Sequence, residues 1–222
     1  MDRLPPRQQR RVPAARALAK LRSVFFPEPD RTIGGREKAV LSQADEPGFG
    51  EFVENRLWLQ SRTAFGVVHV VGSNNDLQPW FGAAETPAQT VLRLAEYQAR
   101  LAATLAWLDE TFEVAEKHEA RAVVLGMQAD TWVAANGFVE VVGRIAELAA
   151  DFEKPVLLLQ GDTHDLLVDK PLENGSTLHG VTTKAPNLTR VVVEGETASE
   201  WLRLTIDPRT PEIFSWERVF LP

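Results

Sequence analysis

The stretch LLLQGDTHDLLVDKPL, residues 157–172, decides how the sequence is interpreted. Its apolar start and the GDTH that follows are typical of a buried strand that ends in a polar turn. A second apolar run, 121–128, lies earlier in the chain, and a helical pattern, 137–152, separates the two. Because apolar strands that alternate with helices pair in parallel, the sequence predicts an α/β fold.

The same alternation extends over most of the chain. Pro27 and Pro29 end a helix predicted from residue 14 to residue 26. The remaining predicted elements are a short helix near 36–44, strands at 57–61 and 63–76 (the second ending in a polar turn), a helix at 86–118, a strand at 154–160, and C-terminal strands at 187–195, 201–207 and 214–220.

The long helix carries its own start signal. Thr86 and Gln89 have the spacing of a capping box, and Pro87 takes the first helical position. The apolar residues that follow recur at steps close to three and four, which predicts a face directed at the core. These residues are Val91, Leu94, Leu101, Leu105, Leu108, Phe112 and Ala115.

Composition and charge exclude several kinds of site and partner. The chain has 222 residues and no cysteine, which excludes disulfides and thiolate zinc sites. Residues 1–22 carry six Arg, one Lys and one Asp, whereas the whole chain has a net charge of −7. We therefore expect a poorly ordered basic arm, 1–13, before one domain, 14–222, and no nucleic-acid partner for that acidic domain. No apolar run is long enough to span a membrane and no signal peptide is recognisable, so a cytoplasmic location is the default expectation.

Three apolar strands end in polar residues. Asn74 follows the first strand, Gln128 ends the second, and Asp162 and His164 follow the third. In open α/β sheets, ligands bind at the carboxyl ends of the strands, where these side chains are expected to gather. Amide, carboxylate and imidazole groups together suit a divalent cation such as Mn²⁺, Fe²⁺ or Zn²⁺.

Each of these residues also has a simpler interpretation. Asn and Asp after a strand commonly form turns with their own backbone, and Asp162 could cap one. His164 could be an exposed loop residue. His69 alternates with Val67 and Val71 and is predicted to pack in the core. The sequence contains no nucleophile elbow, phosphate-binding loop or dinucleotide fingerprint.

Three stretches in this order resemble the C-terminal half of the calcineurin-like metallophosphoesterases, in particular a bacterial branch of that family. They are VVHVVGSNND at 67–76, WLDETFEVAEKHEARAVVLGMQAD at 107–130 and PVLLLQGDTHDLLVDKPL at 155–172. The resemblance implies half or more of an α/β/β/α sandwich and hydrolysis of phosphate esters by a metal-bound hydroxide. His164 and Asp162 would then ligate Mn, Fe or Zn, while Asn74 and Gln128 would bond phosphate oxygens or a bound water.

The sequence departs from the family pattern at its metal motifs. The early Asp-x-His, Gly-Asp and Gly-Asn-His motifs have no counterpart, and Gln128 stands where a metal-binding His is expected. Hydrolysis would therefore require ligands from upstream residues or from another chain. The alternative is an inactive truncated remnant that serves as a binding or scaffold module. The absence of half a sandwich would expose an apolar face, so self-association is also expected.

Overall fold

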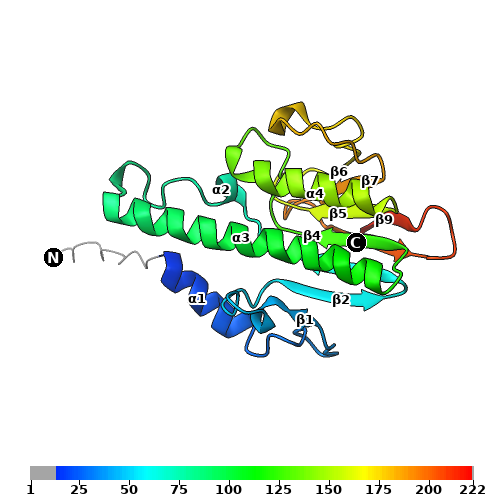
Figure 1. Ribbon diagram of the computed structural model, residues 1–222, viewed down its shortest axis with the longest axis horizontal. Coiled ribbons are helices and arrows are strands. Elements are labelled where there is room, and N and C mark those ends of the chain that lie inside the picture. Colours follow the sequence, from blue (N-terminus) through cyan, green and yellow to red (C-terminus); the bar gives the residue numbers. More distant parts are fainter. Residues whose placement is uncertain (1–13, 222) are drawn as a thin grey trace.

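The computed structural model describes residues 14–221, and the predicted basic arm, 1–13, lies outside them (Figure 1). The prediction of an α/β protein is confirmed. A mixed sheet of seven strands forms the centre, and a separate two-stranded hairpin lies beside it. No helix in the described part of the chain is both long and apolar enough to cross a membrane.

The central sheet is parallel in its middle and antiparallel at both sides. Strands β3, β4, β5 and β7 run parallel, whereas β1 and β2 on one side and β6 on the other run antiparallel to their neighbours. The carboxyl ends of four strands therefore meet at one edge. In spatial order the strands are β1 (Leu41–Ser42), β2 (Arg56–Gln60), β3 (Thr63–Val67), β4 (Ala122–Gly126), β5 (Val156–Gln160), β7 (Leu188–Val192) and β6 (Leu167–Asp169).

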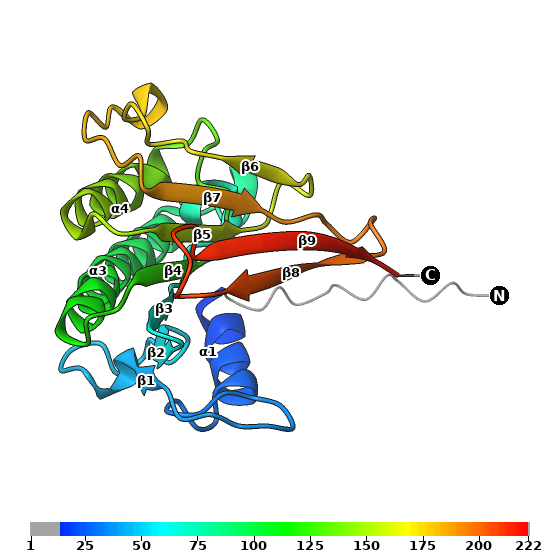
Figure 2. The ribbon, with the colours of Figure 1, turned by 90° about the vertical axis from the view of Figure 1, so that its right-hand side faces the viewer.

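Helices α3 (Pro87–Lys117) and α4 (Val139–Phe152) cover one face of the sheet and bury the main core there (Figure 2). The predicted capping box at Thr86 is confirmed. The predicted apolar stripe is only partly buried, because the first turns of α3 extend beyond the sheet and leave Val91 and Leu94 exposed (Figure 1).

The opposite face has a lighter cover, made by the hairpin of β8 (Glu200–Ile206) and β9 (Phe214–Phe220) and by helix α1 (Ala14–Phe25) (Figure 2). Hairpin side chains such as Leu204 and Trp216 pack on a small buried cluster in the sheet. Between α1 and the sheet an apolar pocket stays open. Self-association of the chain remains a prediction.

Two local predictions were wrong. The predicted helix near 36–44 is instead strand β1 followed by a single 3-10 turn, Gln43–Asp45. The backbone of this segment hydrogen-bonds to the edge of the sheet instead. Leu41 and Ser42 pair with β2, and the Gln43 N–H donates to the Asn55 carbonyl. The strand predicted from residue 63 is shorter than expected, because its ladder ends at Val67 and an extended stretch follows; the polar turn predicted at its end does form, at Gly72–Asn75.

Helix α3 packs tightly against the sheet at Gly66 in β3. A Cβ at this position would lie 2.5 Å from the Thr111 Oγ1. Thr111 is fully buried and its hydroxyl donates to the Trp107 carbonyl, so it has no room to turn away. The absence of a side chain at residue 66 therefore sets the distance between helix and sheet.

We expect Gly66→Ala to lower the free energy of unfolding by about 1–3 kcal/mol, the usual cost of overpacking a filled core. Urea unfolding monitored by circular dichroism measures this change. The control is Gly35→Ala, where a Cβ would meet nothing within 4 Å. A double-mutant cycle with Thr111→Ala should recover part of the loss. If Gly66→Ala behaved like Gly35→Ala, Thr111 would not limit the packing of α3.

Candidate functional site

The candidate site lies at the carboxyl ends of β3, β4 and β5, where the loops after the strands are joined by backbone hydrogen bonds. The Ala129 N–H donates to the Val70 carbonyl at 3.1 Å, and the Gly161 N–H donates to the Gln128 carbonyl at 3.1 Å. Parallel pairing thus brings together three polar segments that are distant in the sequence, as predicted for this kind of sheet.

Gln128 and Asp162 are in direct contact at the centre of this edge. The Gly72 N–H donates to the Gln128 Oε1 at 2.7 Å, and the Gln128 Nε2 donates to the Asp162 Oδ1 at 3.0 Å. The Asp162 carboxylate lies against Gly72, because a Cβ there would be 2.8 Å from both carboxylate oxygens. The Gln128 side chain from one loop and the backbone at Gly72 from another therefore fix the carboxylate.

His164 lies two residues further on and is oriented by a different partner. Its Nδ1 is 2.9 Å from the Glu196 Oε2, and its side chain is 52% exposed. Gly195 permits this position, since a Cβ on it would overlap the His164 Cβ. Asp162 and His164 both adopt positive φ, 76° and 65°. Neither Gln128 nor Asp162 hydrogen-bonds to His164 in the described structure.

Asn74 points to the loop after β4. Its Oδ1 accepts from the Gly137 N–H at 2.7 Å, and its Nδ2 donates to the Asn136 Oδ1 at 2.9 Å. The structure thus places all four predicted site residues at one edge of the sheet. It joins Gln128 directly to Asp162 and leaves Asn74 and His164 on the flanks.

Asn74 belongs to a left-handed turn. All four residues from Ser73 to Asp76 have φ between 53° and 61°. This conformation costs roughly 1–2 kcal/mol per residue for most L-amino acids, although Asn and Asp tolerate it better. Such a turn persists only where its surroundings fix it.

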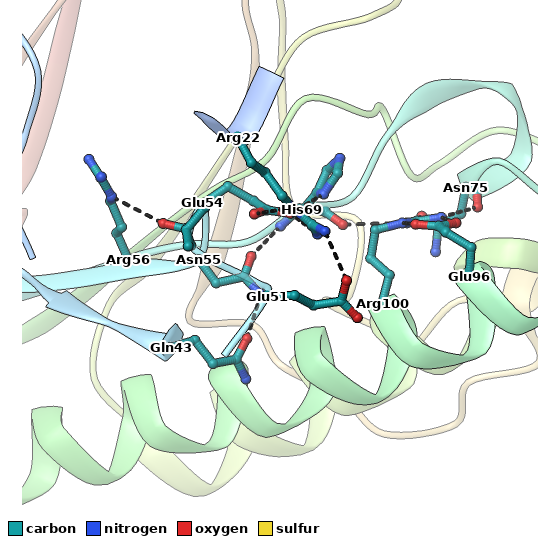
Figure 3. A network of polar contacts seen from close by, with 11 residues as sticks. Arg22, Gln43, Glu51, Glu54, Asn55, Arg56, His69, Asn75, Glu96 and Arg100 are labelled. Carbon is teal, nitrogen blue, oxygen red and sulfur yellow. Dashed lines mark hydrogen bonds and ion pairs between the residues drawn. The ribbon is translucent and has the colours of Figure 1, made fainter. Parts of the chain in front are cut away.

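Arg100 of α3 provides that support (Figure 3). Its guanidinium donates to the Asn75 side-chain oxygen and, at 3.0 Å, to the Asn75 carbonyl. The Asn75 Nδ2 donates to the Gly137 carbonyl at 3.1 Å, while Glu96 pairs with Arg100 at 2.8 Å. Asn75 and Arg100 are both almost completely buried, so the turn is held from the core side.

A second group of charged side chains, Asp130, Asp169 and Arg190, lies next to the loop that carries Asp162. Thr163 donates to Asp130 at 2.5 Å, and Arg190 pairs with Asp130 and with Asp169, each at 2.7 Å. The guanidinium of Arg190 also lies over the Trp132 ring. Because Asp130 is already paired with a buried cation, it fixes the loop that carries Asp162 and is not a free carboxylate at the site.

The donor set fits a divalent cation only in part. A carboxylate and an imidazole are suitable ligands, and the hydrogen bond from Gln128 orients the carboxylate as an outer-shell partner would. Within residues 14–221, no group of three or more His, Cys, Asp or Glu side chains is placed to hold a metal ion. The described residues thus supply at most an incomplete set of ligands.

A polar group around His69 was missed by sequence reasoning. The ring is only partly buried, and its Nδ1 lies 2.6 Å from the Glu54 Oε1, whereas the sequence predicted a packed core residue (Figure 3). Arg22 of α1 pairs with the same carboxylate at 2.6 Å. These three residues come from separate segments with no common motif, so no sequence signal linked them.

The acidity of Glu54 reflects these partners. Burial alone would raise its pKa, but hydrogen bonds from His69 and Arg22 outweigh burial and lower the pKa from 4.5 to about 2. A carboxyl whose pKa is lower in the folded state stabilises the fold above its unfolded-state pKa. This stabilisation is lost as the pH falls from about 4.5 towards 2.

We expect Glu54→Gln to lower the free energy of unfolding at pH 7 by about 1–3 kcal/mol, the usual loss for a hydrogen bond to a charged group. The difference from the wild type should narrow as the pH falls below about 4.5. Urea unfolding at a series of pH values measures it. Glu51→Gln is the matched control, because Glu51 also pairs with Arg22 but is exposed. A difference that stays constant down to the lowest measurable pH would contradict this account of Glu54.

Comparisons with known proteins give no relative for this chain. No protein-family model matches it, and neither a curated protein nor a solved structure matches it. The interpretation of the site therefore depends on its own residues.

Proposed function

We propose that this chain supplies the C-terminal part of a metal-dependent phosphoesterase site of the calcineurin-like type. In this proposal Asp162 and His164 are ligands for Mn, Fe or Zn. Gln128 and Asn74 lie beside them, where an amide can bond a phosphate oxygen or a bound water. The substrate class is a small phosphate ester.

One observation carries the proposal, namely the Asp162 carboxylate held between Gly72 and Gln128 at the carboxyl edge of the parallel strands. A metal ligand must be kept in one orientation by its neighbours, and this carboxylate has such neighbours. His164, two residues away, presents a half-exposed ring whose Nδ1 is already paired with Glu196, which leaves Nε2 as the atom for a metal.

The arrangement of layers agrees with the proposal. Helices α3 and α4, the central sheet and the β8–β9 hairpin are stacked in this order (Figure 2). We interpret them as three layers of an α/β/β/α sandwich, with the hairpin as the start of the second sheet.

Two ligands do not complete a hydrolytic centre. A bound divalent metal would supply Lewis-acid activation of water, and a catalytic zinc generally has three protein ligands for this purpose. Asp162 and His164 account for two, and Gln128 offers only an amide oxygen that is already engaged. The proposal therefore includes further ligands from a segment outside the described residues or from another chain.

A non-catalytic binding or scaffold module is the second candidate function. The observation that favours it is the use of both polar atoms of the Gln128 and Asn74 side chains in joining loops. Residues used in this way stabilise the edge of the sheet whether or not a metal binds. Metal titration separates the two candidates.

We expect the chain alone to bind Mn²⁺ weakly and not to hydrolyse p-nitrophenyl phosphate, because two ligands leave the ion mostly hydrated. Electron paramagnetic resonance of free Mn²⁺ measures the binding. Asp162→Asn and His164→Asn should each abolish it, and Asn is chosen because it tolerates the positive φ of both positions.

Asp151→Asn is the matched control, since Asp151 is an exposed carboxylate at the far end of α4. Mn²⁺ binding that both site variants leave unchanged would show that the site is misplaced and would favour the scaffold function. Substantial turnover by this chain alone would contradict the need for further ligands.

A further inference from the structure

The pocket between α1 and the sheet has a volume of about 550 Å³. This volume is in the range of small-molecule sites, which are concave and mostly apolar with a few polar groups. Leu18, Leu21 and Phe25 of α1 form one wall. The other wall comes from the sheet and the segment after β3, and it includes Trp58, Val68 and Val70.

The charged residues that line this pocket are unequal in number. Two arginines, Arg22 and Arg56, face a single acid, Glu54. Glu54 is already used by Arg22 and by His69, both at 2.6 Å. Arg22 has a second partner in Glu51. Among the residues that line the pocket, positive charges thus outnumber negative ones by one.

Arg56 is the source of this excess. It is only 8% exposed, and in the described structure it makes no ion pair. Its Nε and Nη2 donate to the backbone carbonyls of Val53 and Glu28, at 3.3 and 3.2 Å, and its guanidinium lies 4.6 Å from the centre of the Phe26 ring. The Nη1 has no hydrogen-bond partner among the described residues, and it is not one of the fully buried polar atoms without a partner, so it can donate to solvent or to a ligand.

A buried charge without an ion-pair partner is costly unless an anion accompanies it. Burial lowers the pKa of Arg56, and the field of Asp30 opposes this effect without forming an ion pair. An arginine nevertheless stays protonated, because its ordinary pKa lies far above neutral pH. The guanidinium therefore favours an anionic ligand, and a planar carboxylate suits its geometry.

We infer that this pocket binds a small apolar monocarboxylate, with the carboxylate at Arg56 and the hydrocarbon part between α1 and the sheet. The apolar wall selects the hydrocarbon, and the unpaired guanidinium selects the anion. A cationic ligand is disfavoured by the excess positive charge, and a neutral one leaves Arg56 without an anion. This site goes beyond the proposed phosphoesterase function, because it requires neither a metal ion nor Asp162.

Octanoate and 1-octanol test the inference, because they share a hydrocarbon chain and differ in charge. Isothermal titration calorimetry with EDTA present should show one octanoate bound per chain, about tenfold or more tighter than octanol, since a hydrogen bond to a charged group is worth at least this factor. Arg56→Met should remove the preference for octanoate and leave octanol binding unchanged. Arg209→Met is the matched control, because Arg209 is exposed and pairs with Asp207 away from the pocket.

Leu21→Asp provides a second test that does not depend on a buried residue. Leu21 is 52% exposed at the pocket, so the variant should fold, and a carboxylate there should repel octanoate and weaken its binding at least tenfold. Equal affinity for octanoate and octanol, or octanoate binding unaffected by Leu21→Asp, would overturn the inference. So would a wild-type dimer in sedimentation that Leu21→Asp dissociates, because a second copy would then fill the pocket.

Discussion

The position of Arg100 is the constraint on which the candidate site depends. This residue reaches from the buried face of α3 to the loop after β3 and holds a turn that four left-handed residues would not maintain alone. A buried guanidinium is tolerated only where its donors are satisfied, and Asn75 and Glu96 satisfy them here. Helix α3 therefore fixes the position of the loop after β3. Gly72, at the start of that loop, fixes Gln128 in turn by donating to its side-chain oxygen.

Each group at the strand ends is held by a neighbour from another element. Arg100 holds the turn, Gly72 holds Gln128, and Gln128 holds Asp162. Rigid support of this kind is what a metal ligand or a hydrogen-bonding group needs before any ligand arrives. His164 is the exception, because an exposed Glu196 is its only ion-pair partner among the described residues. Of the two proposed ligands, Asp162 is thus the better ordered by its surroundings.

The parts of the fold that the sequence predicted are those with a regular period or a defined cap. The run at 121–128, the capping box at Thr86 and the hairpin strands all appear close to their expected bounds. A polar turn was predicted after the strand from residue 63, but its left-handed conformation was not, since it depends on Arg100, a residue about 25 positions later with no local signal. The partner of His69 could not be predicted either. Its alternation with Val67 indicated burial, but His69 pairs with Glu54 from the loop before β2. Long-range polar pairs leave no periodic pattern, so the contacts within the site remained beyond sequence reasoning.

The proposed metal ligands and the apolar pocket are neighbours with a common wall. Gln128 lines the pocket, yet both polar atoms of its amide are engaged with Gly72 and Asp162. The charge that distinguishes the pocket lies elsewhere, on Arg56 in β2, whereas Asp162 follows β5 on the other side of β3 and β4. Arg56 and Asp162 therefore lie on opposite sides of β3 and β4, and Gln128 lies beside both the pocket and the carboxylate. Because the amide of Gln128 is engaged with Gly72 and Asp162 while the pocket's unpaired charge lies on Arg56, substitutions at Arg56 and at Asp162 test the two sites separately.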